Sequence, residues 1–161
     1  MKVQDVMSKR IISISPDESA AVAARLLSHY NIGALPVCTK DGKLRGMVTD
    51  RDIVLRCVAA EEDPQSIKVS EIMTRRVFSV GSQQNIDEVS ALMAKEKIRR
   101  LPVQDNSRVV GMVSLSDFSR LPQCRQQATA AFNEITNNMR TYLVKKDTLY
   151  YRCPSAFFVI S

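Results

Sequence analysis

The sequence predicts an α+β fold in which two tandem repeats, each ordered strand, helix, strand, strand, helix, pack as a pseudo-two-fold pair, with a helical extension after them. The first supporting observation is a duplication, because Leu35-Pro36-Val37 recurs as Leu101-Pro102-Val103, 66 residues later (102 − 36). The second is that short apolar runs alternate with segments of helical periodicity in both copies. The expected boundaries are repeat 1 over 1–60, a linker over 61–68, repeat 2 over 69–121 and the extension over 122–161.

The first strand and helix of each repeat follow a short lead-in segment, which is Val3 to Ser8 in repeat 1 and Val69 to Met73 in repeat 2. Apolar and β-branched residues over 11–14 and 77–80 predict strands. Ser15, followed by Pro16 and Glu18, indicates a helix start, with Ser19 as the alternative cap. The apolar face of this helix is expected at Ala20, Ala23, Ala24 and Leu27. In repeat 2 a helix is expected from Asn85, with Glu88 completing a possible capping box.

Each repeat then ends in a hairpin and a second helix. In repeat 1 the strands are expected over 34–38 and 44–48, because the turn Lys40-Asp41-Gly42 suits a hairpin. In repeat 2 they are expected over 101–103 and 109–113. The closing helices are expected over 50–59 and 117–121.

The extension differs in composition from the repeats. It holds six of the nine aromatic residues, and Phe132, Ile135, Met139 and Tyr142 follow a helical stripe. Such a stripe either packs on its own core or pairs with a second copy, and we expect a homodimer.

Bulk composition narrows the function classes. The net charge of +6 is divided equally between the repeats and the extension. Residues 1–121 hold 18 basic and 15 acidic side chains, and residues 122–161 hold 5 basic and 2 acidic ones. Such a small and dispersed excess of positive charge does not favour nucleic-acid binding. The four cysteines are far apart and a single histidine is present, which argues against zinc and disulfides and suits the cytoplasm. We expect neither a signal peptide nor a membrane span, and no group of residues suggests an enzyme.

The motifs that carry chemistry are Thr49-x-x-Asp52 and Ser114-x-x-Asp117, each at a strand-to-helix junction. Both match the capping box of an ordinary helix. They also suit a nucleotide, because a helix N-terminus and a hydroxyl favour phosphate, and a carboxylate one turn later suits the two hydroxyl donors of a ribose.

The run Ile32 to Val37 followed by Gly46 to Asp52, with its second copy Ile98 to Val103 followed by Gly111 to Ser114-Leu115-Ser116-Asp117, resembles the cystathionine β-synthase (CBS) domain. Over residues 3–121 the chain is similar to a CBS pair, or Bateman module. The resemblance implies regulatory binding of an adenosine ligand such as AMP, ADP, ATP or S-adenosylmethionine, rather than a catalytic cofactor. It also implies that Asp52 and Asp117 hold ribose, while Thr49 and Ser114 lie toward the phosphates.

The resemblance further implies that each site takes a wall from the other repeat. The Asp52 site would take Ile98, Arg99 and Arg100, and the Asp117 site would take Ile32, Gly33 and Ala34. Only the Asp52 site then gains arginines, besides its own Arg51, so we expect it to prefer the more highly charged nucleotide. The alternative is that these arginines solvate a strand edge. Met47 and Met112 are candidates for the adenine slots or for the core.

We therefore expect an adenine-nucleotide sensor that signals to an unidentified effector protein through a small shift between the repeats. One alternative is a ligand-free dimerisation scaffold. Another is single-stranded nucleic-acid binding through Arg75, Arg76, Arg99 and Arg100.

Overall fold

The computed structural model describes residues 1–144, and within them every side chain except those of Gln123, Gln127 and residues 137–144. The expected order of elements is confirmed for both hairpins and for the long helices. Repeat 1 contains a 3-10 turn at Val3–Asp5, α1 (Ala20–His29), β1 (Ala34–Cys38), β2 (Leu44–Thr49) and α2 (Asp50–Ile53), which continues as a π-helical turn over Val54–Val58. Repeat 2 contains α3 (Val69–Ile72), α4 (Ile86–Glu96), β3 (Arg100–Asp105), β4 (Arg108–Ser114) and α5 (Leu115–Ser119), followed by a 3-10 turn at Pro122–Cys124 and by α6 (Arg125–Val144).

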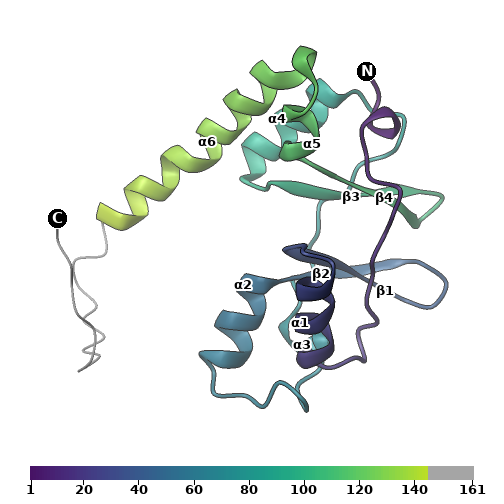
Figure 1. The fold of residues 1–161 in the computed structure, drawn as a ribbon, viewed down its shortest axis with the longest axis vertical. Helices are drawn as coiled ribbons and strands as arrows, with labels where there is room; N and C mark the ends of the chain where they lie inside the picture. Colours follow the sequence, from purple (N-terminus) through teal and green to yellow (C-terminus); the bar gives the residue numbers. More distant parts are fainter. Residues whose placement is uncertain (145–161) are drawn as a thin grey trace.

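The two hairpins are antiparallel and equivalent in register. Leu35 lies opposite Val48 in repeat 1, and Leu101 lies opposite Val113 in repeat 2, with a bulge at the same position of each hairpin. Figure 1 shows the two hairpins at the middle of the molecule, with α1, α2 and α3 beyond one and α4 and α5 beyond the other. This arrangement places both strand-to-helix junctions at the seam between the repeats.

The predicted strands over 11–14 and 77–80 are wrong. Each segment is extended but pairs at one residue, through the parallel bridges Ile14–Val37 and Val80–Val103. The backbone on either side leaves the sheet edge, because the preceding residues cross to the other repeat. The cap of α1 is the alternative residue, Ser19, whose Oγ accepts the Val22 N–H at 3.4 Å.

The two lead-ins are exchanged between the repeats. Val3 is fully buried in the core of repeat 2, beside Ile86 and Val89, and its N–H donates to the Gln84 carbonyl at 3.0 Å. Conversely, Val69 and Ile72 are buried in the core of repeat 1, with Leu35 and Val48. Each core therefore contains residues from the lead-in that precedes the other repeat.

The helical faces agree with the expectation in part. Ala20, Ala23 and Leu27 are buried as expected, but Ala24 is exposed and Ala21 is buried in its place. On α6, Ile135 is buried in the repeat 2 core together with Ala128 and Ala131, whereas Phe132 is 50% exposed. The side chains of Met139 and Tyr142 lie outside the described residues.

Candidate functional site

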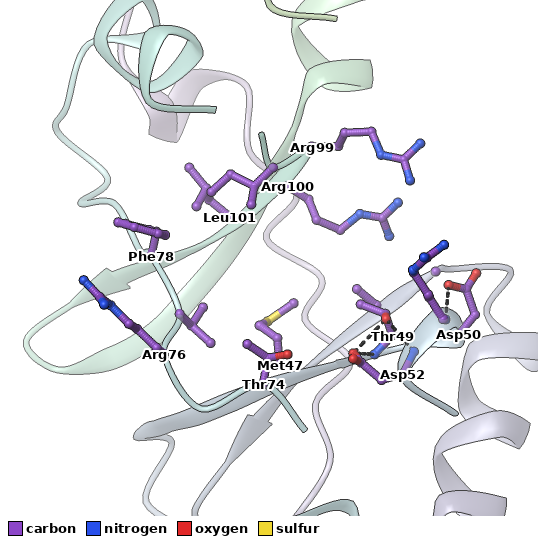
Figure 2. A pocket seen from close by; sticks show the side chains of 15 residues that line it. Met47, Thr49, Asp50, Asp52, Thr74, Arg76, Phe78, Arg99, Arg100 and Leu101 are labelled. Atoms are coloured by element: carbon purple, nitrogen blue, oxygen red, sulfur yellow. Dashed lines mark hydrogen bonds between the residues drawn. The ribbon is translucent and has the colours of Figure 1, made fainter. Parts of the chain in front are cut away.

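The structure brings the residues of the predicted Asp52 site together in one cavity of about 330 Å³, here called the Asp52 cleft. One wall comes from β2 and the start of α2, and the opposite wall comes from the segment that leads into β3 (Figure 2). Its lining residues are Gly33, Ala34, Met47, Thr49, Asp50, Arg51, Asp52, Thr74, Arg76, Val77, Phe78, Ile98, Arg99, Arg100 and Leu101.

Both motifs form complete capping boxes, as one of the two sequence interpretations requires. Oδ2 of Asp52 accepts hydrogen bonds from the Thr49 N–H at 2.9 Å and from Thr49 Oγ1 at 2.7 Å, and Thr49 Oγ1 accepts the Asp52 N–H at 3.1 Å. Asp117 Oδ2 accepts from the Ser114 N–H at 2.8 Å and from Ser114 Oγ at 2.7 Å. These bonds fix each carboxylate at the mouth of its helix.

Capping does not exhaust the capacity of these carboxylates. An ionised carboxylate offers about four acceptor positions on its two oxygens. In Asp52 the cap uses Oδ2, and Oδ1 lies 3.4 Å from Arg56 Nη1. The side chain is only 14% exposed, but its oxygens retain lone pairs for a further donor. The capping and ligand-binding interpretations are therefore compatible.

A second cavity of about 360 Å³, the Asp117 cleft, contains the other predicted set. Its lining residues are Ser8, Arg10, Ile12, Asn31, Ile32, Gly33, Ala34, Pro36, Arg100, Met112, Val113, Ser114, Ser116, Asp117 and Arg120. Gly33 and Ala34, predicted for this cleft alone, line the Asp52 cleft as well.

Sequence reasoning missed the residues at the end of each lead-in and directly after it. Thr74, Arg76 and Phe78 line the Asp52 cleft, and their counterparts Ser8, Arg10 and Ile12 line the Asp117 cleft. The signal was present, because these pairs also differ by 66 (74 − 8, 76 − 10, 78 − 12).

The expectation that the Asp52 site alone gains arginines is wrong. The Asp52 cleft holds four arginines and two aspartates, and the Asp117 cleft holds Arg10, Arg100 and Arg120 with one aspartate. The formal lining charge is therefore +2 in both (4 − 2 and 3 − 1). Charge gives no reason for the Asp52 cleft to prefer the more highly charged nucleotide. The two clefts differ instead in their apolar end, where Phe78 occupies the position of Ile12.

Arg100 lies at the centre of the seam. A Cβ added at Gly33 would lie 3.1 Å from Arg100 Nη1 and 3.4 Å from Asp50 Oδ2, so the absence of a side chain at residue 33 lets the guanidinium approach the backbone closely. Burial lowers the pKa of Arg100, and the charge of Arg99 lowers it further, whereas Asp50 and Asp117 oppose that change. Charged groups of both repeats therefore act on the guanidinium of Arg100.

Within the part of the chain that the structure describes, no group of three or more His, Cys, Asp or Glu side chains is arranged to hold a metal ion. Among residues 1–144, no helix combines the length and the apolar character needed to cross a bilayer.

Comparison with known proteins identifies the same family that the two motifs resemble. The CBS domain family model matches residues 3–58 and 69–123. The chain is 37% identical over 135 residues to the CBS domain-containing protein YhcV of Bacillus subtilis, covering 84% of this chain and 95% of YhcV.

Two solved structures share the fold. The crystal structure of Hypoxic Response Protein I with two coordinated zinc ions has a TM-score of 0.70 and 34% identity, covering 76% of this chain and all of that one. The CBS domain pair of protein MJ0100, in complex with 5′-methylthioadenosine and S-adenosyl-L-methionine, has a TM-score of 0.68 and 36% identity, covering 74% and 94%. With two matched repeats, this chain belongs to the CBS domain family as a tandem pair.

Proposed function

We propose that this chain is a non-enzymatic regulatory module that binds adenosine-containing ligands in its two clefts and signals to an effector protein. The observation that carries the proposal is the pairing, in each cleft, of a hydroxyl and a carboxylate from one repeat with a wall from the other. The MJ0100 pair, which shares 36% identity, was solved with two adenosine derivatives bound, which supports the same ligand class here.

The Asp52 cleft offers a different environment to each part of such a ligand. Phe78 and Met47 lie toward one end, which suits the flat apolar faces of adenine (Figure 2). The lone pairs left on Asp52 suit the ribose hydroxyls. At the same end as Asp52, Arg99 and Arg100 extend from the opposite wall and suit phosphate or carboxylate oxygens (Figure 2).

A ligand in either cleft contacts both repeats, so it favours the arrangement in which both walls fit it. A shift between the hairpins follows from that differential affinity. Because α6 packs on the repeat 2 core through Ala128, Ala131 and Ile135, it moves with that repeat and is a route to the effector.

We further propose a cytoplasmic homodimer. Cys38 and Cys57 are free, buried cysteines, which suits a reducing compartment. Val54, Leu55 and Val58 on the π-helical turn after α2 are 51–63% exposed, and a second copy would cover such apolar side chains.

A thermal-shift panel of AMP, ADP, ATP, S-adenosylmethionine and NADH, with GTP as the control ligand, tests the ligand class. A ligand at one hundred times its Kd adds about 2.7 kcal/mol, which raises the Tm by roughly 5–10 °C for a chain of this size. Asp52→Ala and Asp117→Ala should each reduce the shift.

The matched control variant is Asn85→Ala. Asn85 Oδ1 accepts the Asp87 N–H at 3.0 Å and caps α4, but Asn85 lines neither cleft. This variant loses a helix cap and should keep the full ligand-induced shift. If it lost the shift as Asp52→Ala does, the carboxylates would act on stability alone.

The second candidate is the ligand-free scaffold, which the complete capping boxes and the exposed apolar side chains after α2 favour. It predicts no shift with any ligand, together with a dimer that Val58→Asp converts to a monomer in light scattering. A nucleotide-dependent shift that Asp52→Ala abolishes would exclude it.

A further inference from the structure

Arg100 is the residue at which the two clefts meet. Its side chain lines the Asp52 cleft and the Asp117 cleft, although it arises from repeat 2 alone. At the equivalent position repeat 1 has Ala34 (100 − 66). The centre of the pseudo-two-fold pair therefore contains one guanidinium where strict symmetry would place two or none.

The guanidinium of Arg100 lies against repeat 1. Its Nη1 is 3.1 Å from the position of an added Cβ on Gly33, so a side chain at residue 33 would have to displace it by a few tenths of an ångström. Asp50 of repeat 1 and Asp117 of repeat 2 both act electrostatically on this guanidinium. The charge of Arg100 therefore interacts with both sites.

We propose that Arg100 is a shared anion-binding residue of the two clefts, so that anionic adenosine ligands bind them with negative coupling. This inference rests on the proposed function. A guanidinium fork frequently pairs in bidentate fashion with a single phosphate group, and this is the pairing that the proposal assigns to Arg100. The first ligand engages the fork, and the second binds without it. Since linkage is reciprocal, each ligand weakens the other by the same factor, which we expect to be about 5-fold or more.

Direct repulsion between two bound phosphates would produce coupling of the same sign. The two explanations differ in how they depend on Arg100. If the ligands compete for the guanidinium, removing it abolishes the coupling. If they repel each other, removing it takes away a screening positive charge and strengthens the coupling.

The test is calorimetric titration of the full chain with ATP, and separately with uncharged adenosine. Asp52→Ala and Asp117→Ala each leave one cleft, which gives the intrinsic Kd of the other. The stepwise constants of the parent chain then yield the coupling factor. Arg100→Ala copies the repeat 1 residue, and Arg100→Gln preserves the length of the side chain if the alanine variant does not fold.

The matched controls are Arg76→Ala, which lines the Asp52 cleft alone, and Arg10→Ala, which lines the Asp117 cleft alone. Each should weaken ATP at one cleft and leave the coupling factor unchanged. Negative coupling for ATP, absent for adenosine and lost in the Arg100 variants, supports the proposal. So does binding of one ATP by the parent chain when each aspartate variant also binds one.

Independent ATP sites, or coupling that grows in the Arg100 variants, would overturn the shared residue but leave the proposed function standing. ATP binding by only one of the aspartate variants would likewise overturn the sharing. A chain that binds neither ATP nor adenosine would overturn both.

Discussion

Gly46 is the residue at which a substitution tests the exchange of the lead-ins most directly. The residue lies in β2 opposite Val37 and is buried. An added Cβ would stand 2.8 Å from Met73 Sδ, at the end of the lead-in of repeat 2, and 2.7 Å from the carbonyl oxygen of Thr74, the next residue. A carbonyl oxygen cannot give way as a side chain can, and this one accepts the Met47 N–H at 2.9 Å.

Gly46→Ala should therefore push the lead-in away from β2 and disturb the pairing of Met47 with Thr74. Overpacking of this kind costs about 1–3 kcal/mol. For a chain of this length the Tm should fall by roughly 2–12 °C. Urea unfolding followed by circular dichroism gives the free energy directly.

Gly81→Ala is the matched control. The nearest atom to its added Cβ, the Gln104 carbonyl oxygen, lies at 4.0 Å, an ordinary contact. Gly81 does not have a positive φ, so alanine should be neutral or stabilise by about 0.4–1 kcal/mol. Parent-like stability of Gly46→Ala, or equal losses in the two variants, would refute the packing of the lead-in on β2.

Three further predictions follow from the fold. Asp52→Ala and Asp117→Ala should each lower the free energy of unfolding by about 1 kcal/mol without any ligand, because each removes a capping box; urea unfolding of the ligand-free chain measures this. Ile72→Ala should cost about 2–5 kcal/mol, and hydrogen exchange should show the loss of protection in β1 and β2 before β3 and β4, because Ile72 is buried in the repeat 1 core. The hydrogen bond from Thr39, and then that with Lys43, lower the pKa of Asp41 from 3.8 to about 2, so any stability linked to it is complete above pH 4 and is lost as the pH falls toward 2. NMR titration of the Asp41 carboxyl should show this pKa, and Thr39→Val should move it back toward 3.8.

The sequence was sufficient for the hairpins and for the motif residues that line the two clefts. The reason is that strand alternation and the duplicated motifs are local signals, and the pairing of Asp52 with Ile98 and Arg99 came with the family resemblance. Each capping box was also visible as a four-residue pattern.

The exchange of the lead-ins was not predictable from the same signals. Val3 and Val69 are the same residue type at equivalent positions, so either one satisfies either core. The missing strands over 11–14 and 77–80 have the same origin. A run of β-branched residues predicts extended backbone. The number of hydrogen bonds that it makes to the sheet depends on the position from which the preceding residues approach.

The arginines of the Asp117 cleft were missed for a different reason. Arg10 lies outside the recognised motif, and Arg100 was assigned to one cleft because it comes from one repeat. A long side chain at a seam can serve both sides, and only the structure shows that Gly33 provides the space.

The exchanged lead-ins also affect events on the ribosome. The repeat 1 core is complete once Met73 has been made, and this half can fold while translation continues. Val3 must wait for its partners in repeat 2, the last of which along the chain is Ile135. At about 5–20 residues per second, those 132 residues (135 − 3) take roughly 7–26 s. During that interval this apolar segment of the nascent chain has no core to enter, and a chaperone can bind it.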